Sequence, residues 1–279
     1  MVTYQRFAPP EELRDLIEHV WLVESPPLPS LRQDILIPNG RPGLAIALAE
    51  PGTRHDPVTR TEWPNTASVF GIMTRPQVIG QTGTSSYAGV EFAPWGMAAL
   101  GRDDRLVDGV LQLSDWVGDT TTAALVEDLR REPFGRSRAD RLAAFLAPRL
   151  TDVPAMSLVE RAVRVIDEAH GRTTVADVAA ASGTSYSTLY RVFVRTLGIG
   201  PKQYAEIIRY YHFAGGLIGG PADAAATLSA LHGYYDQAHA ARDFKRYTGV
   251  SATSFRAVQN GIAALMHGRS VQDGARPGE

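Results

Sequence analysis

Apolar residues in the first hundred positions of the chain occur in short runs, and glycine and proline separate these runs. Four of the runs cover residues 34–37, 44–48, 68–72 and 87–92. Short apolar runs bounded by turn-forming residues are typical of β-strands. The pattern therefore predicts about seven short strands, which suit a small barrel or sandwich.

The apolar pattern changes from about residue 98 onward. Residues 122–129 and 139–146 place apolar side chains three and four positions apart, which is the spacing of an amphipathic helix. A segment at 148–154, bounded by prolines, then precedes a new helical pattern that begins at Leu158 and ends at Gly171.

These patterns predict an α+β chain, and its length of 279 residues favours two domains. We expect residues 1–150 to form a β-rich domain with a helical end from about residue 98. We expect residues 156–260 to form an all-α domain, and residues 261–279, rich in Gly, Arg and Asp, to be a flexible tail.

The all-α domain contains an internal repeat, and a repeat has to be recognised before single motifs are interpreted. The first copy matches residues fifty positions later, and beyond its glycine the offset becomes 51. The matched pairs include Val175 with Ala225, Val178 with Leu228, Gly183 with Gly233, Ser185 with Asp236, Arg191 with Arg242, Phe193 with Phe244 and Gly198 with Gly249.

Each copy carries the signals of two helices joined by a tight turn. Thr174 and Asp177 have capping-box spacing at the start of the first helix, and Gly183 suits the left-handed residue that ends it. Ser185 is a good N-cap for the second helix, and Asp236 takes its place in the second copy. The pattern predicts two helix-turn-helix units. A helical bundle or solenoid is the alternative, but a solenoid usually needs about three copies.

The second helix of the first copy has a buried face and an exposed face. Leu189, Val192 and Phe193 form the predicted buried stripe, so the residues between them point outward. The outward residues are Tyr186, Ser187, Tyr190, Arg191, Val194 and Arg195, and the second copy presents Gln237, Ala238, His239, Ala241 and Arg242. A short helix with such polar and guanidinium groups fits the major groove of DNA, which is about 12 Å wide.

Residues 158–258 resemble the DNA-binding domain of the AraC/XylS family of bacterial transcription regulators. The order and spacing of residues 178–183, 189–193, 198–204, 209–214 and 233–244 carry the resemblance. It implies seven helices, with two helix-turn-helix units joined by a long helix over about residues 201–218. Arg209 matches the characteristic arginine of that helix.

The resemblance also assigns roles to individual residues. Base contacts fall on Ser187, Tyr190 and Arg191 in the first unit, and on Gln237, Ala238, Ala241 and Arg242 in the second. The chemistry agrees, because arginine suits guanine, glutamine suits adenine and an alanine methyl packs on thymine. Phosphate contacts suit Arg195, Lys245 and Arg246, and His239 could make either kind. One chain would then read two adjacent major-groove segments, about 34 Å apart.

The second unit departs from the family pattern in two places. Ala240 stands where a large apolar or aromatic residue is usual, and residues 224–226 are three alanines. Alanine also occupies positions 238 and 241. We therefore expect looser packing and a weaker or more apolar readout from the second unit.

Charge and composition limit the other possibilities. The net charge is −2, but residues 156–260 hold eleven basic and eight acidic side chains, a net +3, and the remainder carries −5. The basic excess thus lies in the part assigned to DNA. The absence of cysteine excludes disulfides, thiolate zinc sites and cysteine nucleophiles. Because the sequence contains no apolar stretch long enough for a signal peptide or membrane helix, we expect a soluble, cytoplasmic protein with no membrane partner.

The β-rich half resembles the sensory and oligomerisation half of such regulators, which is often cupin-like, and residues 92–101 carry this similarity. The implied partners are double-stranded DNA, a small-molecule effector, a second copy of the chain in a homodimer and, if the chain is an activator, RNA polymerase. Candidates for lining a ligand pocket, or for ordinary core, are Trp21, Trp63, Trp95 and Trp116.

A barrel enzyme or carbohydrate-binding protein with a fused helical domain is the alternative from another class. A metal-dependent cupin needs a histidine cluster, but only His19 and His55 precede Pro148. Neither a Gly-x-Ser-x-Gly elbow nor a phosphate-binding Gly-rich loop occurs. We therefore expect no enzyme, catalytic residue, metal or cofactor. A regulator controlled by abundance alone, without a ligand, is a third possibility.

Overall fold

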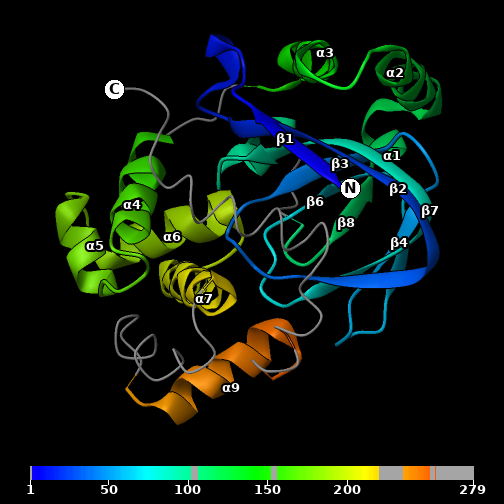
Figure 1. The fold of residues 1–279 in the computed structure, drawn as a ribbon. Coiled ribbons are helices and arrows are strands. Elements are labelled where there is room, and N and C mark those ends of the chain that lie inside the picture. Colours follow the sequence, from blue (N-terminus) through cyan, green and yellow to red (C-terminus); the bar gives the residue numbers. More distant parts are fainter. Residues whose placement is uncertain (1, 102–105, 152–155, 220–234, 252–254, 256–279) are drawn as a thin grey trace.

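The β-rich half is a bent, eight-stranded antiparallel sheet (Figure 1). The computed structural model describes residues 2–101, 106–151, 156–219, 235–251 and 255. The strands are β1 (Thr3–Phe7), β2 (Ile17–Leu36), β3 (Gly43–Ala47), β4 (Gly52–His55), β5 (Glu62–Asn65), β6 (Ala67–Phe70), β7 (Gln77–Phe92) and β8 (Val110–Gln112). Their order is β1-β2-β7-β3-β6-β8, and β4 pairs with β5 and β7 beside this path.

Two strands are much longer than the apolar runs predict. The run at 34–37 coincides with the end of β2, which stops at Leu36, and residues 87–92 are the end of β7. The register of β2 against β7 shifts twice between Ser25 and Arg32, in a stretch that contains Pro26, Pro27 and Pro29. Because proline has no N–H for the strand ladder, bulges carry β2 past these residues and bend it. The expectation of short strands only was therefore wrong, since the prolines mark a bend within one strand.

The two faces of the sheet have different neighbours. Leu22 and Leu44 are fully buried in a core shared with α1 (Leu113–Val117), α2 (Asp119–Arg131) and α3 (Arg136–Leu146). Since side chains alternate across a strand, Trp21, Val23 and Ala45 lie on the opposite face, in a separate cluster inside the bend. The predicted helices after residue 98 thus cover one face of the sheet (Figure 1), and the other face lies inside the bend.

The helical half follows the predicted order. Its helices are α4 (Met156–Glu168), α5 (Val175–Ala181), α6 (Tyr186–Leu197), α7 (Pro201–Gly219) and α9 (Gln237–Thr248). The first predicted helix-turn-helix unit is α5 and α6, α7 is the predicted long helix, and α9 is the second helix of the second unit. Residues 224–226, Gly233 and the tail at 261–279 lie outside the described residues.

The two halves share one apolar core. Ile37 and Trp95 of the β-rich half belong to the same buried cluster as Phe193 and Tyr204 of the helical half. The Trp95 indole N–H donates to the Asp15 carbonyl at 2.7 Å, which fixes this ring at the junction. The helical half is therefore packed directly against the sheet domain (Figure 1).

A polar cluster centred on Arg41 lies at the same junction. Arg41, in the loop between β2 and β3, donates to Glu18 Oε1 at 2.9 Å and to Asp167 Oδ2 at 2.7 Å. It also donates to the Tyr204 hydroxyl at 2.7 Å, and that hydroxyl donates to Asp167 Oδ1 at 3.0 Å. Burial raises the pKa of Glu18, while the neighbouring Arg41 charge opposes that rise. One arginine thus joins the sheet domain to α4 and α7.

Candidate DNA-binding surface and ligand pocket

The two candidate recognition helices, α6 and α9, are built alike. Both have 12 residues. Ser185 accepts a hydrogen bond from the Thr188 N–H at 3.2 Å, and Asp236 accepts one from the His239 N–H at 2.6 Å. Both helices end at a left-handed glycine, with φ of 79° and 75° at Gly198 and Gly249. Caps and glycines are each 51 positions apart, so the second-helix part of the predicted repeat is confirmed.

The turn of the first unit also has its predicted form. The Thr174 side chain accepts from the Asp177 N–H at 3.2 Å, and its hydroxyl donates to Asp177 Oδ2 at 2.7 Å. Gly183 has a φ of 66°, the left-handed conformation that glycine adopts most easily. The caps expected from the sequence are therefore confirmed at both ends of α5, the helix that leads into the turn.

The exposed face of α6 contains every residue predicted for it. Leu189 and Phe193 are fully buried, and Val192 is half-buried against the core. The exposed side chains are Tyr186, Ser187, Tyr190, Arg191, Val194 and Arg195. Two of them, Tyr186 and Tyr190, are stacked with ring centres 6.4 Å apart and are 59% and 49% exposed. The helix thus offers two aromatic faces beside its arginines.

The exposed face of α9 contains Ala238, Ala241, Arg242, Lys245 and Arg246. Gln237 is the first residue of the helix, but its side chain lies outside the described part of the chain. Ala240, the departure noted in the sequence, is buried and 1% exposed. Within the described ranges Arg242 and Lys245 form no ion pair, so both cations can meet a polyanion.

His239 lies differently from the other candidates on α9. It is half-buried, with Nε2 3.7 Å from Asp243 Oδ2. The same carboxylate oxygen lies 3.6 Å from Arg209 Nη2 on α7. Arg209 thus links α7 to α9, and His239 belongs to the same charged cluster.

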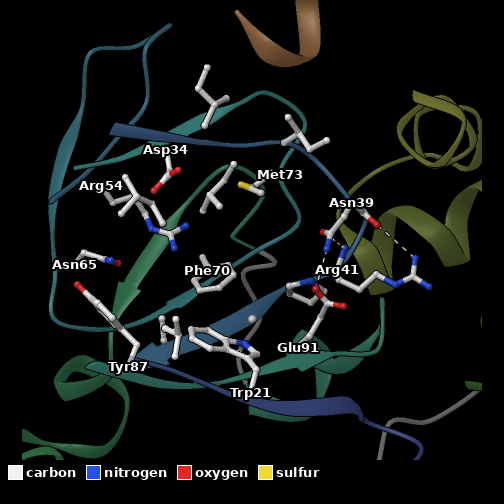
Figure 2. Close-up of a pocket in the computed structure, with 18 of the residues that line it drawn as sticks. Trp21, Asp34, Asn39, Arg41, Arg54, Asn65, Phe70, Met73, Tyr87 and Glu91 are labelled. Carbon is white, nitrogen blue, oxygen red and sulfur yellow. Dashed lines mark hydrogen bonds between the residues drawn. The ribbon is translucent and has the colours of Figure 1, made fainter. Parts of the chain in front are cut away.

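A pocket opens inside the bend of the sheet (Figure 2). Its cavity volume is about 110 Å³, several times the roughly 10–15 Å³ that one water needs. Trp21 of β2 and Tyr87 of β7 form part of its wall. Tyr211 of α7 and Phe255 line it as well, so the helical half contributes to the same pocket.

Arg54 on β4 lies at one end of this pocket, with Asn65 and Tyr87 nearby (Figure 2). Its side chain is 2% exposed and donates to Gln77 Oε1 at 2.6 Å. The guanidinium carbon is 4.3 Å from the centre of the Phe70 ring. Burial lowers the pKa of Arg54 to about 10. The pocket therefore contains a desolvated cation at one end.

The other end of the pocket carries Asn39, Arg41 and Glu91 (Figure 2). The Asn39 amide donates to Glu91 Oε2 at 2.8 Å, and burial raises the pKa of Glu91. This end borders the Arg41 cluster that joins the two halves.

Sequence reasoning identified one pocket residue and missed the charged ones. Of the four tryptophans, Trp21 lines the pocket, Trp95 and Trp116 pack in the two larger cores, and Trp63 is half-buried on β5. Arg54 belongs to no motif. Only its position in the strand could have indicated that it is buried. Side chains alternate between the two faces of β4, so Arg54 shares the inner face with the buried Gly52, two residues earlier.

The described residues contain no group of three or more His, Asp or Glu side chains that could hold a metal ion. None of the helices in the same ranges has the length and apolar character that crossing a membrane requires.

Two protein families match separate parts of the chain. A family described as a helix-turn-helix domain matches residues 178–257, and a domain of unknown function (DUF6597) matches residues 5–104. The lactose operon transcription activator of Staphylococcus xylosus is 34% identical over 83 residues, which are 30% of this chain and 29% of that protein. The chain thus spans less than a third of the length of this relative.

Among solved structures, the fold is similar to that of ToxT from Vibrio cholerae. Two ToxT structures superpose with a TM-score of 0.50 at 11% and 10% identity, covering 83% of this chain and 98% and 97% of ToxT. The likeness confirms the α+β fold, with a β-rich half followed by helices. The helix-turn-helix match and the activator agree with the resemblance to the DNA-binding domain of AraC/XylS regulators found in the sequence.

Proposed function

We propose that residues 156–260 bind a specific DNA site and that residues 1–150 control this binding in response to a small molecule. The observation that carries the proposal is the pair α6 and α9, with equivalent caps 51 residues apart and cationic exposed faces. Helices of this length, capped and exposed in this way, fit the major groove.

Within this proposal the exposed residues divide by chemistry. Arg191 and Arg242 can each donate two hydrogen bonds to guanine, and Tyr190, Ser187, Ala238 and Ala241 can contact neighbouring base edges. Arg195, Lys245 and Arg246 are assigned to phosphates, together with Tyr186 at the start of α6. Gln237 keeps its predicted contact to adenine, and His239 is assigned to the phosphate side of α9.

The pocket supplies a physical route from ligand to DNA. Phe255 lines the pocket, and its ring packs edge-on against Phe244 of α9, with centres 5.3 Å apart. Tyr211 brings α7 to the same pocket. A ligand that contacts Phe255 and Tyr211 in only one arrangement of the two halves would favour that arrangement. The affinity for DNA would change with it if the arrangements bind DNA differently.

The test begins with selection of binding sites from fragmented genomic DNA, followed by titration of the selected site at fixed salt. Arg191→Ala and Arg242→Ala should each weaken specific binding by about 1–3 kcal/mol and largely spare random DNA. Arg161→Ala is the matched control, because Arg161 is an exposed arginine on α4 and belongs to neither recognition helix. Failure to select any site, or equal losses on random DNA, would refute sequence-specific reading by these arginines.

Other partners stay predictions from the sequence. These are a homodimer through the β-rich half and, for an activator, RNA polymerase. We assign no catalytic step to the chain, since the helix-turn-helix match and the activator it is similar to both favour DNA binding. Turnover of a small substrate by the purified chain, without DNA affinity, would support the barrel-enzyme alternative instead.

A further inference from the structure

Two arginines line the pocket, and their surroundings differ. Arg41 pairs with two carboxylates, Glu18 at 2.9 Å and Asp167 at 2.7 Å. Arg54 is more deeply buried, yet no carboxylate within the described ranges forms an ion pair with it. The nearby acid Asp34 has a cation of its own, since it lies 3.6 Å from Arg32 Nε. A buried charge without a counterion is costly, and proteins seldom keep one without a function.

Two buried donor atoms at this end have no hydrogen-bond acceptor among the described residues. Arg54 Nε has no hydrogen-bond acceptor, and neither does Nε2 of Gln77, the residue that accepts from Arg54. Gln77 is itself buried, with 1% of its surface exposed. Both atoms are donors, so the group that would satisfy them must offer acceptor oxygens. Guanidinium groups bind carboxylate and phosphate oxygens especially well, because their donors form a planar fork.

The rest of the pocket favours a small apolar body attached to those oxygens. Trp21, Phe70 and Ile79 line it, and Phe70 already stacks on the Arg54 guanidinium. The volume of about 110 Å³ holds roughly seven to eleven atoms of the size of water. That is the size of one aromatic ring carrying an acidic group.

We propose that the pocket binds a small organic anion, whose acidic oxygens pair with Arg54 and whose apolar body lies among Trp21, Phe70 and Ile79. The inference deepens the proposed function and rests on it for its regulatory meaning, but ligand binding can be measured without DNA. The ligand supplies the counterion that the sheet domain lacks, and Gln77 orients the guanidinium toward it.

The experiment uses the full chain and matched pairs of acids and neutral amides. The acids are benzoate, phenylacetate and hexanoate, and phenyl phosphate tests whether a phosphate replaces the carboxylate. Binding is measured by calorimetry at constant ionic strength and by the change in tryptophan fluorescence, to which Trp21 in the pocket wall contributes. We expect at least one acid to bind with a millimolar or lower dissociation constant and its amide to bind at least tenfold more weakly. Arg54→Gln should weaken binding of that acid by roughly 10- to 100-fold.

Controls separate loss of the site from loss of the fold. Arg60→Gln removes an exposed arginine from the turn between β4 and β5 and should leave acid binding unchanged. Arg54→Lys keeps the charge without the fork and should bind the acid with intermediate affinity. This variant decides the question if Arg54→Gln does not fold, as judged by circular dichroism.

Several outcomes would overturn the inference. They are binding of the amides as tightly as the acids, unchanged acid binding by Arg54→Gln, and failure of every acid to bind at millimolar concentration. If an acid binds through Arg54 but the chain selects no DNA site, the ligand assignment stands and the proposed function fails. If neutral amides bind and alter DNA affinity, the proposed function stands and the anion assignment fails.

Discussion

Replacing Arg54 by methionine should stabilise the ligand-free protein. Burial lowers the pKa of Arg54 to about 10, against an ordinary value of about 12.5, and each pKa unit corresponds to about 1.4 kcal/mol. The buried charge therefore costs the folded protein about 3 kcal/mol. Methionine keeps apolar contact with Phe70 but leaves Gln77 Oε1 without its donor, which costs about 1–2 kcal/mol. The expected net gain is about 1–2 kcal/mol.

The assay is urea unfolding of the full chain followed by circular dichroism, with Arg60→Met as the matched exposed control. The guanidinium is charged in both the folded and unfolded states below its folded pKa. The gain should therefore be constant from neutral pH to about 9, and shrink only as pH rises through the folded pKa. If Arg54→Met lost more than about 1 kcal/mol of stability, the reasoning would be refuted, because Arg54 would then stabilise the ligand-free sheet.

Three further predictions concern the junction and the helical half. Arg41→Gln should lower the free energy of unfolding by about 2 kcal/mol, less than for a fully buried pair because the Glu18 side chain is 34% exposed. Urea titrations should show that this loss of stability grows as pH rises through the raised pKa of Glu18 and shrinks where that carboxyl is protonated. Gly171→Ala should cost about 2–4 kcal/mol in thermal unfolding, because φ is 69° and the new Cβ would lie 2.2 Å from the Ala205 carbonyl oxygen. Asp236→Ala should cost about 1 kcal/mol and speed hydrogen exchange at the start of α9, whereas Asp236→Asn should keep the cap and behave as wild type.

The local signals in the sequence were sufficient for the helix ends that the structure describes in the helical half. Ser185, Asp236, Gly183 and Gly198 act through their own backbone neighbours, so their spacing alone predicted the caps that the structure has. The exposed face of α6 followed from the buried stripe around Leu189 in the same way. Such features need no knowledge of distant contacts.

The β-rich half was predicted only in class, because its details depend on distant pairing. The stretch after Ser25 contains three prolines, and only the pairing of Ser25, Leu28 and Arg32 with β7 shows a bulged, continuous strand. The pocket cation was missed for the same reason, since Arg54 meets Gln77 and Phe70 across the sheet. The Arg41 junction joins positions 126 residues apart, Arg41 and Asp167, which no periodicity connects.

The β4–β5 hairpin stands apart from the main path of the sheet and pairs with β7 at three positions only, Thr53, Arg54 and His55. It carries the pocket cation but makes none of the Arg41 bonds that hold the helical half. Under the proposed function, changes in this hairpin would alter which small molecule the protein binds and leave its DNA site unchanged. Exchanging the hairpin between related proteins would be a direct way to build sensors with new inputs on one DNA-reading scaffold.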